Sequence, residues 1–329
     1  MIDLLKEKEH FKVDLSQEEL IVEISKMRKE RNAIILAHYY QEAEIQDIAD
    51  YIGDSLQLSQ VAAKTSADVI VFAGVHFMAE TAKILSPAKT VLLPDTDAGC
   101  SLADSCNDED FKLFLTKYPG YTVISYVNTT AKIKALTDII CTSSNALGIV
   151  NSLDASEKII FAPDRNLGKY IQSMTGRDMI IWDGACHVHE RFSLEKIVFL
   201  KNQNPDAKII SHPECDNKIL LISDFIGSTF ALLSFVKKDS ALKYIVCTES
   251  GILHQMKLAM PSKVFVPAPP NDSTCACNEC QFMKLITLKK IYLSLKYNRF
   301  EINLDENIRV KAEIPIRRML SISDSLGFK

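Results

Sequence analysis

Short apolar runs alternate with helical stretches along the chain. The runs are rich in Val and Ile and end in polar residues; they cover residues 33–37, 69–74, 122–127, 158–162, 208–211 and 244–247. Continuous apolar strands that alternate with helices are typical of parallel sheets covered on both faces. Ligands of such sheets bind beyond the carboxyl ends of the strands. We therefore expect an α/β protein whose chemistry lies in the polar residues that follow each run.

A threefold internal repeat accompanies this alternation. Three segments align without gaps, and they begin at Asp50, Asp138 and Asp224. The fifth residue after each aspartate carries a hydroxyl group: Ser55, Ser143 and Thr229. Because an apolar helical stretch follows each hydroxyl, we expect these residues at or near helix N-caps, where free N–H groups favour carboxylate or phosphate. Plain capping without a ligand is the alternative.

Two further features recur in the three segments. Twelve residues before each aspartate, after or at the end of an apolar run, stand His38, Tyr126 and His212. A cysteine with polar or glycine neighbours follows each segment: Cys100, Cys186 and Cys280. Chance similarity between short α/β motifs is the alternative explanation. A true triplication predicts three pseudo-threefold-related αβα sandwich units with short parallel sheets around a central cavity.

Composition and charge exclude several classes of protein. Hydrophobic residues make up 47% of the chain and charged residues 24%, which suffices for a core and excludes general disorder. The net charge of −4 argues against nucleic acid as the main partner. No apolar run approaches the ~18 residues that span a bilayer, and the N-terminus, which mixes acids and bases, does not resemble a signal peptide. We expect a cytoplasmic protein without a membrane partner.

The nine cysteines point to metal ligands. A disulfide framework is not expected in a reducing compartment, and an odd count prevents full pairing. A four-cysteine zinc site usually shows two CxxC pairs, whereas only Cys277 and Cys280 have this spacing. Three thiols from three units favour an iron–sulfur cluster with one open, Lewis-acidic iron. The cysteines flanked by apolar or strand residues are expected to include inert buried thiols: Cys141, Cys215 and Cys247.

The repeat also divides the chain. We expect the first unit in residues 1–100, the second in 101–185 and the third in 186–270. Residues 271–329 are expected to form a cluster-ligand loop and a C-terminal helix or tail that packs back on the first unit.

The motifs of the chain resemble those of the quinolinate synthases, iron–sulfur enzymes of bacterial NAD biosynthesis. The resemblance covers roughly residues 30–300 and rests on LAHYYQ (36–41), GDSLQ (53–57), FAGVHFMAETA (72–82), DAGC (97–100), YVN (126–128), TSSNA (142–146), PDRNLG (163–168), WDGACHVH (182–189), HPEC (212–215), GST (227–229) and CQFMK (280–284). It implies three αβα domains around a central cavity, in agreement with the repeat.

The resemblance also implies an activity and a cofactor. The reaction is the condensation of iminoaspartate with dihydroxyacetone phosphate to quinolinate, phosphate and water. The cofactor is a [4Fe-4S] cluster on Cys100, Cys186 and Cys280, with its fourth iron facing the substrate. Some members place the third ligand in a CxxCxxC run, whereas here Cys275 and Cys277 precede Cys280, which leaves the role of the first two open. Because the imine is short-lived in water, we expect hand-off from an aspartate-oxidising enzyme.

Substrates with two carboxylates and a phosphate need fixed donors, and the reaction needs several proton transfers. The expected catalytic residues are Glu214, Tyr40, Tyr126 and His212. The expected substrate-binding residues are His38, Ser55, Tyr126, Val127, Asn128, Ser143, His212, Pro213, Glu214 and Thr229. Glu214 is the expected base, the histidines are expected to donate to oxygens or shuttle protons, and the tyrosines act as phenolic donors, or as acids if their environment lowers their pKa.

Other polar residues of the motifs have lesser expected roles. His187 and His189 are expected to orient the cluster rather than to ligate it. Glu80 and Glu249 are weaker catalytic candidates, and Arg165 is the one cation expected to bind anions. Two other functions fit the thiols: an iron–sulfur hydro-lyase acting on a hydroxy acid, and a non-catalytic zinc-binding protein.

Overall fold

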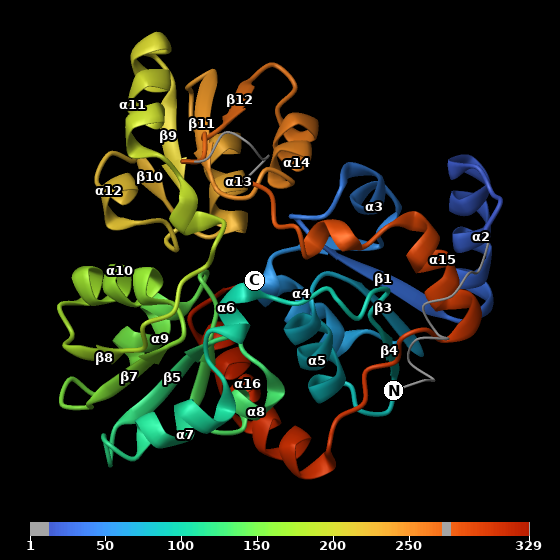
Figure 1. Ribbon diagram of the computed structural model, residues 1–329, viewed down its shortest axis with the longest axis horizontal. Coiled ribbons are helices and arrows are strands. Elements are labelled where there is room, and N and C mark those ends of the chain that lie inside the picture. Colours follow the sequence, from blue (N-terminus) through green and yellow to red (C-terminus); the bar gives the residue numbers. More distant parts are fainter. Residues whose placement is uncertain (1–12, 272–277, 329) are drawn as a thin grey trace.

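The computed structural model describes residues 13–271 and 278–328, whose strands form three parallel sheets of four strands each (Figure 1). The first, in the order β2-β1-β3-β4, contains β1 (Ala33–His38), β2 (Tyr51–Gly53), β3 (Val69–Ala73) and β4 (Thr90–Leu92). The second, β6-β5-β7-β8, contains β5 (Thr122–Tyr126), β6 (Ile139–Cys141), β7 (Ile159–Ala162) and β8 (Met179–Ile181). The third, β10-β9-β11-β12, contains β9 (Lys208–Ser211), β10 (Phe225–Ile226), β11 (Lys243–Cys247) and β12 (Val264–Pro267). One topology used three times confirms the predicted fold of repeated αβα units.

Helices cover these sheets and connect their strands. In the first unit they are α2 (Gln17–Glu30), α3 (Ala43–Ile48), α4 (Ser55–Lys64) and α5 (His76–Leu85). The second has α6 (Ser101–Asp104), α7 (Asp108–Leu115), α8 (Ala131–Lys134), α9 (Ala146–Ser152) and α10 (Arg165–Thr175); the third has α11 (Leu194–Gln203), α12 (Asn217–Leu220), α13 (Thr229–Lys238) and α14 (Ile252–Ala259). None of the helices in the described ranges is long and apolar enough to cross a membrane.

The six predicted strands are the two central strands of each sheet. They are β1, β3, β5, β7, β9 and β11, and their observed bounds lie within one residue of the predicted ones. A central strand is buried on both faces and therefore appears in the sequence as a continuous apolar run. The outer strands contain only two to four residues each, which is too short for such a signal.

The repeated aspartate ties an outer strand to the first strand of its unit. One carboxylate oxygen of each aspartate accepts a backbone N–H from the first strand. The donor is Ile35 to Asp50 (2.8 Å), Val123 to Asp138 (2.8 Å) and Ile209 to Asp224 (2.7 Å). The N–H of each aspartate also donates to the carbonyl of the same partner. These reciprocal hydrogen bonds satisfy backbone groups before the outer strand begins, which explains why an aspartate recurs there.

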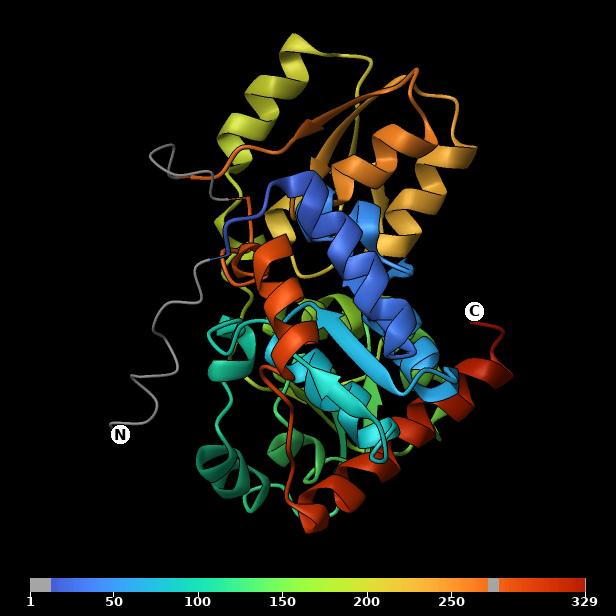
Figure 2. The ribbon, with the colours of Figure 1, turned by 90° about the vertical axis from the view of Figure 1, so that its right-hand side faces the viewer.

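The C-terminal segment contacts two different units. Its first α-helix, α15 (Leu288–Tyr297), packs on α2 and β3 of the first unit, beside α2 in Figure 2. The long α16 (Glu306–Ser325) packs chiefly on α8, β6 and α9 of the second unit. Within α16, the Ser323 hydroxyl accepts a hydrogen bond from the side-chain amide of Asn145 at 2.9 Å. The side-chain oxygen of the same Asn145 accepts from Thr142 N–H at 2.6 Å. This helix therefore supports the turn that carries Ser143.

The reciprocal bonds of the repeated aspartate should contribute to stability. We expect Asp224→Ala to lower the free energy of unfolding by about 1 kcal/mol, because Ile209 N–H loses its acceptor. Urea unfolding followed by circular dichroism measures the change. Asp224→Asn keeps an acceptor oxygen and should lose less; equal losses for the two variants would contradict the assignment.

Candidate active site

A cavity is formed by residues from all three units and the C-terminal segment, many of them at the carboxyl ends of strands. Most predicted site residues line it: His38, Tyr40, Ser55, Cys100, Tyr126, Asn128, Ser143, Cys186, His212, Glu214, Thr229 and Cys280. Val127 and Pro213 are not among the lining residues. The Val127 N–H donates to the Cys141 carbonyl at 2.8 Å, so this N–H extends the pairing between β5 and β6.

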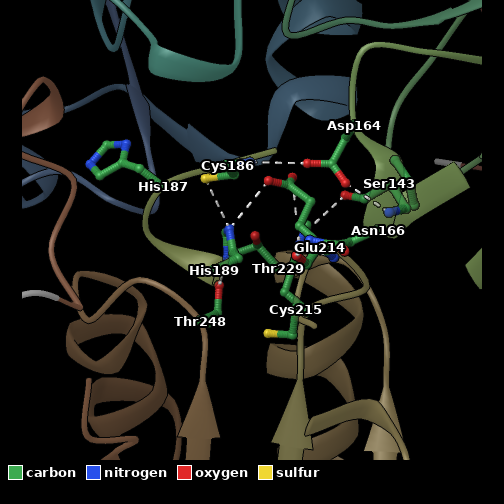
Figure 3. A network of polar contacts seen from close by, with 12 residues as sticks. Ser143, Asp164, Asn166, Cys186, His187, His189, Glu214, Cys215, Thr229 and Thr248 are labelled. Carbon is green, nitrogen blue, oxygen red and sulfur yellow. Dashed lines mark hydrogen bonds and ion pairs between the residues drawn. The ribbon is translucent and has the colours of Figure 1, made fainter. Parts of the chain in front are cut away.

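Glu214 is the centre of the polar network in the cavity (Figure 3). The Tyr126 hydroxyl donates to Oε1 at 2.5 Å, and His189 Nδ1 lies 3.2 Å from Oε2. The Asn166 amide donates to the main-chain oxygen of Glu214 at 3.1 Å. Burial opposes a charged carboxylate, but the interactions with His189 and His212 and the hydrogen bonds from His189 and Tyr126 outweigh it and lower the pKa of Glu214 below its usual value. Glu214 is therefore an ionised carboxylate in a buried site.

A chain of hydrogen bonds connects Glu214 with Tyr40. His189 Nε2 lies 2.9 Å from Thr248 Oγ1, and the Tyr40 hydroxyl lies 2.8 Å from that oxygen and 2.9 Å from Thr229 Oγ1. Because a carboxylate only accepts, His189 donates to it from Nδ1, and in the tautomer without a proton on Nε2 it accepts from Thr248. Tyr40 then donates to Thr248, and Thr229 donates to Tyr40. All the hydrogen bonds of the chain thus point toward Glu214.

His38 and His212 occupy equivalent repeat positions and have the same environment. The N–H of Tyr40 donates to Nδ1 of His38 at 3.2 Å, and the N–H of Glu214 donates to Nδ1 of His212 at 3.3 Å. Each ring therefore carries its proton on Nε2, which in His212 lies 3.1 Å from the Ser143 hydroxyl. Burial lowers the pKa of both histidines to about 3, against the opposing effect of Glu214. They are neutral in this environment and can donate from Nε2, and the expected shuttling of protons stays a prediction.

The two cavity tyrosines lack the lowered pKa that an acid role requires. Burial, reinforced by the charge of Glu214, raises the pKa of Tyr40 and Tyr126 well above the usual value. Both are neutral hydroxyl donors in this environment. The neighbouring Tyr39 lies outside the cavity lining and contacts Gln57 through its hydroxyl at 3.3 Å.

The three repeated hydroxyls lie next to helix N-termini but do not cap them. Asp54 caps α4 and Ser228 caps α13, so Ser55 and Thr229 are the first residues of these helices. Ser143 lies in the turn before α9. Because neighbouring residues provide the caps of α4 and α13, the side chains of Ser55 and Thr229 remain available to the cavity.

Cys100, Cys186 and Cys280 are free, half-buried thiols, and all three line the same cavity. Burial raises the pKa of Cys100 to about 12 and of Cys280 to about 11, and raises that of Cys186 well above its usual value. Within residues 13–271 and 278–328, the three sulfur atoms do not converge closely enough to share one ion. The only group that does so there is Cys186, His189 and Glu214.

Carboxylates beyond two equivalent strands hold two of the cysteine loops. Asp164 follows β7, and its Oδ2 accepts the N–H of Cys186 at 3.2 Å. Glu249 follows β11, and its Oε1 accepts the N–H of Cys280 at 3.1 Å. Lys284 Nζ lies 3.2 Å from the same Glu249 oxygen and donates to the Tyr40 carbonyl at 3.0 Å. The Cys280 loop is thus held between the first and third units.

The remaining predicted residues have structural contacts near the cavity. His187 Nδ1 lies 2.5 Å from the Ser101 hydroxyl, in the helix that follows Cys100. Arg165 pairs with Glu190, and Glu80 accepts the Ala131 N–H at 2.9 Å. The cysteines expected to be inert are fully buried: Cys141, Cys215 and Cys247. Cys275 and Cys277 lie outside the described residues.

Sequence reasoning missed Thr248 and Asp164, which organise the site. Both come just beyond a predicted strand, Thr248 directly after β11 and Asp164 two residues after β7. The rule that polar residues after apolar runs carry the chemistry would have selected both, as it selected Glu249 beyond the same strand as Thr248.

The fold and the cavity together define a class of α/β protein in which three repeated units place thiols, a buried carboxylate and neutral histidines around one site. The family described as "Quinolinate synthetase A protein" matches residues 22–321. The chain belongs to this family.

Individual relatives agree over nearly the whole chain. A protein of Microcystis aeruginosa named quinolinate synthase is 60% identical over 306 residues, which are 93% of this chain and 96% of the relative. A Synechococcus protein of the same name is 59% identical, covering 91% of this chain and 94% of the relative. One from Chloroherpeton thalassium is 55% identical, covering 94% and 97%.

The neutral histidines give a prediction for pH dependence. Because the folded-state pKa of His38 and His212 lies near 3, below the unfolded value of about 6.5, unfolding takes up protons between these limits. Their contribution to stability should therefore fall as the pH decreases from about 6.5. Nitrogen NMR shifts, assigned with His38→Gln and His212→Gln, should still show the Nε2–H tautomer at pH 5. A charged ring at that pH would contradict the prediction.

The Lys284 ion pair should stabilise the Cys280 loop. We expect Lys284→Met to lower the free energy of unfolding by about 3 kcal/mol, because it leaves the buried Glu249 carboxylate without its cation. Urea unfolding measures this, and Lys284→Arg, which keeps the charge, should recover part of the loss. Wild-type stability in Lys284→Met would show that the pair does not hold the loop.

Proposed function

We propose that the chain condenses iminoaspartate with dihydroxyacetone phosphate and releases quinolinate, inorganic phosphate and water. The observation that carries this proposal is the presence of three half-buried cysteines and one ionised carboxylate in the same cavity, in a chain of the quinolinate synthetase A family. The reaction joins two small anions, removes phosphate and closes a ring. It therefore needs an enclosed site with anion donors and a base.

The donor set fits a [4Fe-4S] cluster held by Cys100, Cys186 and Cys280. Cluster thiolates bind different iron atoms, so their sulfurs need not meet at one point, in keeping with the spread of the three thiols. Because burial raises the pKa of each thiol, the thiols ionise only when a strong positive charge, such as that of bound iron, lies beside them. When bound, such a cluster would supply a Lewis-acidic iron with an open position.

Glu214 is the proposed base that moves a proton between neighbouring carbon atoms of the triose. A carboxylate suits this step because its two oxygens can reach adjacent atoms. The hydroxyl of Tyr126 and the ring of His189 hold it in place, and its lowered pKa keeps it in the ionised form that can accept a proton. Tyr126 also places a neutral donor beside the site of proton transfer.

Neutral donors are proposed to bind the anionic groups of the substrates. Ser55 and Thr229 stand at the first turns of two ten-residue helices, whose N-terminal dipoles favour negative charge. The Nε2–H groups of His38 and His212 add donors without adding charge. The buried side-chain oxygen of Asn128 has no hydrogen-bond partner within residues 13–271 and 278–328, and it can accept from an N–H or O–H of the substrate.

The hydrogen-bond chain from Thr229 to Glu214 is proposed to carry protons through the site. Each step passes a proton from a hydroxyl to the next acceptor, and His189 connects the Thr248 hydroxyl with the carboxylate. Tyr40 lies in the middle of the chain and lines the cavity, so its hydroxyl can turn from Thr248 to donate a hydrogen bond to a substrate oxygen.

We also propose that the chain works in the cytoplasm and receives its imine from an aspartate-oxidising enzyme. The chemical reason is that an imine of aspartate hydrolyses in water. A higher quinolinate yield with that enzyme than with free imine at equal supply would support the hand-off.

Reconstitution with iron and sulfide under anaerobic conditions tests the proposed reaction. We expect about four iron atoms per chain, and equal amounts of quinolinate and phosphate from the two substrates. Cys100→Ala, Cys186→Ala and Cys280→Ala should each lose most of the iron and at least a hundredfold in rate, because each would remove one of three ligands. Cys106→Ala, a buried cysteine outside the cavity lining, is the matched control.

Two results would contradict the proposal. Dehydration of a hydroxy acid without phosphate release would identify a hydro-lyase. A colourless protein that retains zinc after reconstitution and makes no quinolinate would identify a zinc-binding protein.

A further inference from the structure

A second metal-binding arrangement overlaps the thiol site. Cys186, His189 and Glu214 each present one ligand atom, and these three atoms lie within 4.8 Å of one another. The Nδ1 atom of His189 lies 3.3 Å from the Cys186 sulfur and 3.2 Å from Glu214 Oε2 (Figure 3). A tetrahedral zinc ion with its usual bond lengths separates such ligand atoms by about 3.4–3.6 Å. The two separations from His189 Nδ1 are therefore close to those of a zinc site, and the third lies within 4.8 Å.

The surrounding groups already orient each ligand. Tyr126 occupies Glu214 Oε1 and leaves Oε2 available, while Asp164 fixes the backbone N–H of Cys186. Thr248 contacts His189 Nε2 at 2.9 Å, and its hydroxyl can accept from that nitrogen when the proton is there. Nδ1 is then a free metal ligand. Such outer contacts are typical of histidine metal sites.

We propose that Cys186, His189 and Glu214 form a zinc site in the chain that carries no cluster, and that zinc bound there blocks cluster assembly. Sulfur, nitrogen and oxygen donors together suit Zn²⁺, and three protein ligands leave a fourth position open to the cavity. Binding releases the thiol proton of Cys186 and moves the His189 proton from Nδ1 to Nε2. Glu214 is already ionised and releases none.

Competition follows because Cys186 would serve both metals. The competition rests on the proposed function, in which Cys186 is a cluster ligand. Zinc binding itself does not depend on that function. The two ligand sets are otherwise separate: the zinc site uses His189 and Glu214, and the cluster site uses Cys100 and Cys280. Substitutions can therefore distinguish the two sites.

Zinc binding to the full chain, purified without iron and kept reduced, tests the site. Cys275 and Cys277, which lie outside the described residues, are replaced by serine so that they cannot bind zinc. We expect one zinc per chain in competition with a chromophoric chelator, and Co²⁺ should show a thiolate charge-transfer band. His189→Gln and Glu214→Gln should abolish tight binding. Thr248→Val should weaken zinc binding about 10- to 100-fold, because the Thr248 hydroxyl then no longer holds the His189 proton on Nε2.

Matched controls separate this site from the three thiols. Cys100→Ser and Cys280→Ser should keep wild-type zinc affinity, as should His254→Gln, whose ring contacts Asp47 away from the cavity. Thermal unfolding checks that each variant is folded; if His189→Gln is not, Thr248→Val carries the test. Zinc binding that survives His189→Gln but is lost in Cys100→Ser would overturn the proposal, as would the absence of one-to-one binding.

A second measurement tests the block on cluster assembly. Loading with one zinc per chain should reduce subsequent iron uptake at least tenfold, and a zinc chelator should restore it. The same loading should not affect iron uptake by His189→Gln. Full iron uptake by the zinc-loaded wild type would overturn the block while leaving the zinc site in place. Because these readouts count metal atoms, a failure to make quinolinate would affect only the proposed function.

Discussion

The cavity is organised around a buried negative charge that has no adjacent lysine or arginine among the described residues. Glu214 is 2% exposed, and an ionised carboxylate in such a place is unstable unless donors surround it. Here the donors come from parts of the chain far apart: Tyr126 from the end of β5 and His189 from the loop that follows Cys186. The need to satisfy one carboxylate therefore fixes the second unit against the third, and it also places the thiol loop.

The threefold repeat supplies equivalent backbone positions that have acquired different chemistry. His38 and His212 each accept the N–H two residues ahead and present a neutral donor, whereas Tyr126 at the same position donates to Glu214. The aspartate that anchors each repeat has kept one role in all three units. Positions that stabilise the sheet are thus alike, and positions at the cavity have diverged, as expected when only the cavity faces a low-symmetry substrate.

A second layer of carboxylates links the thiols to the scaffold. Asp164 and Glu249 lie two residues beyond equivalent strands, and each accepts the N–H of a cysteine. The first unit has Val75 at this position, so Cys100 is held differently. Lys284 connects this layer to the backbone of Tyr40, so that the loop of the third thiol and a proton donor of the cavity share one support. A change in the packing of Lys284 therefore affects the Cys280 loop and Tyr40 together.

The central strands, the repeat and most cavity residues could be recognised in the sequence because each leaves a local signal. A strand buried on both faces must be apolar throughout, and a repeated unit must place equivalent residues at equal spacings. The outer strands were missed because five of them contain only two or three residues, and the four-residue β12 is interrupted by exposed positions. Partners of cavity residues were missed for another reason: Thr248 and His189 are 59 residues apart, and nothing local relates them.

The pKa of each cavity group was likewise beyond the reach of sequence. A histidine near a glutamate suggests a titrating pair, yet burial keeps the rings of His38 and His212 neutral, and the backbone N–H groups bound to them fix the tautomer. Residue types and spacings thus determined which groups could reach the cavity. Only the tertiary structure decided which atoms meet and which carry protons, because burial and hydrogen-bond partners depend on the packing of the three units.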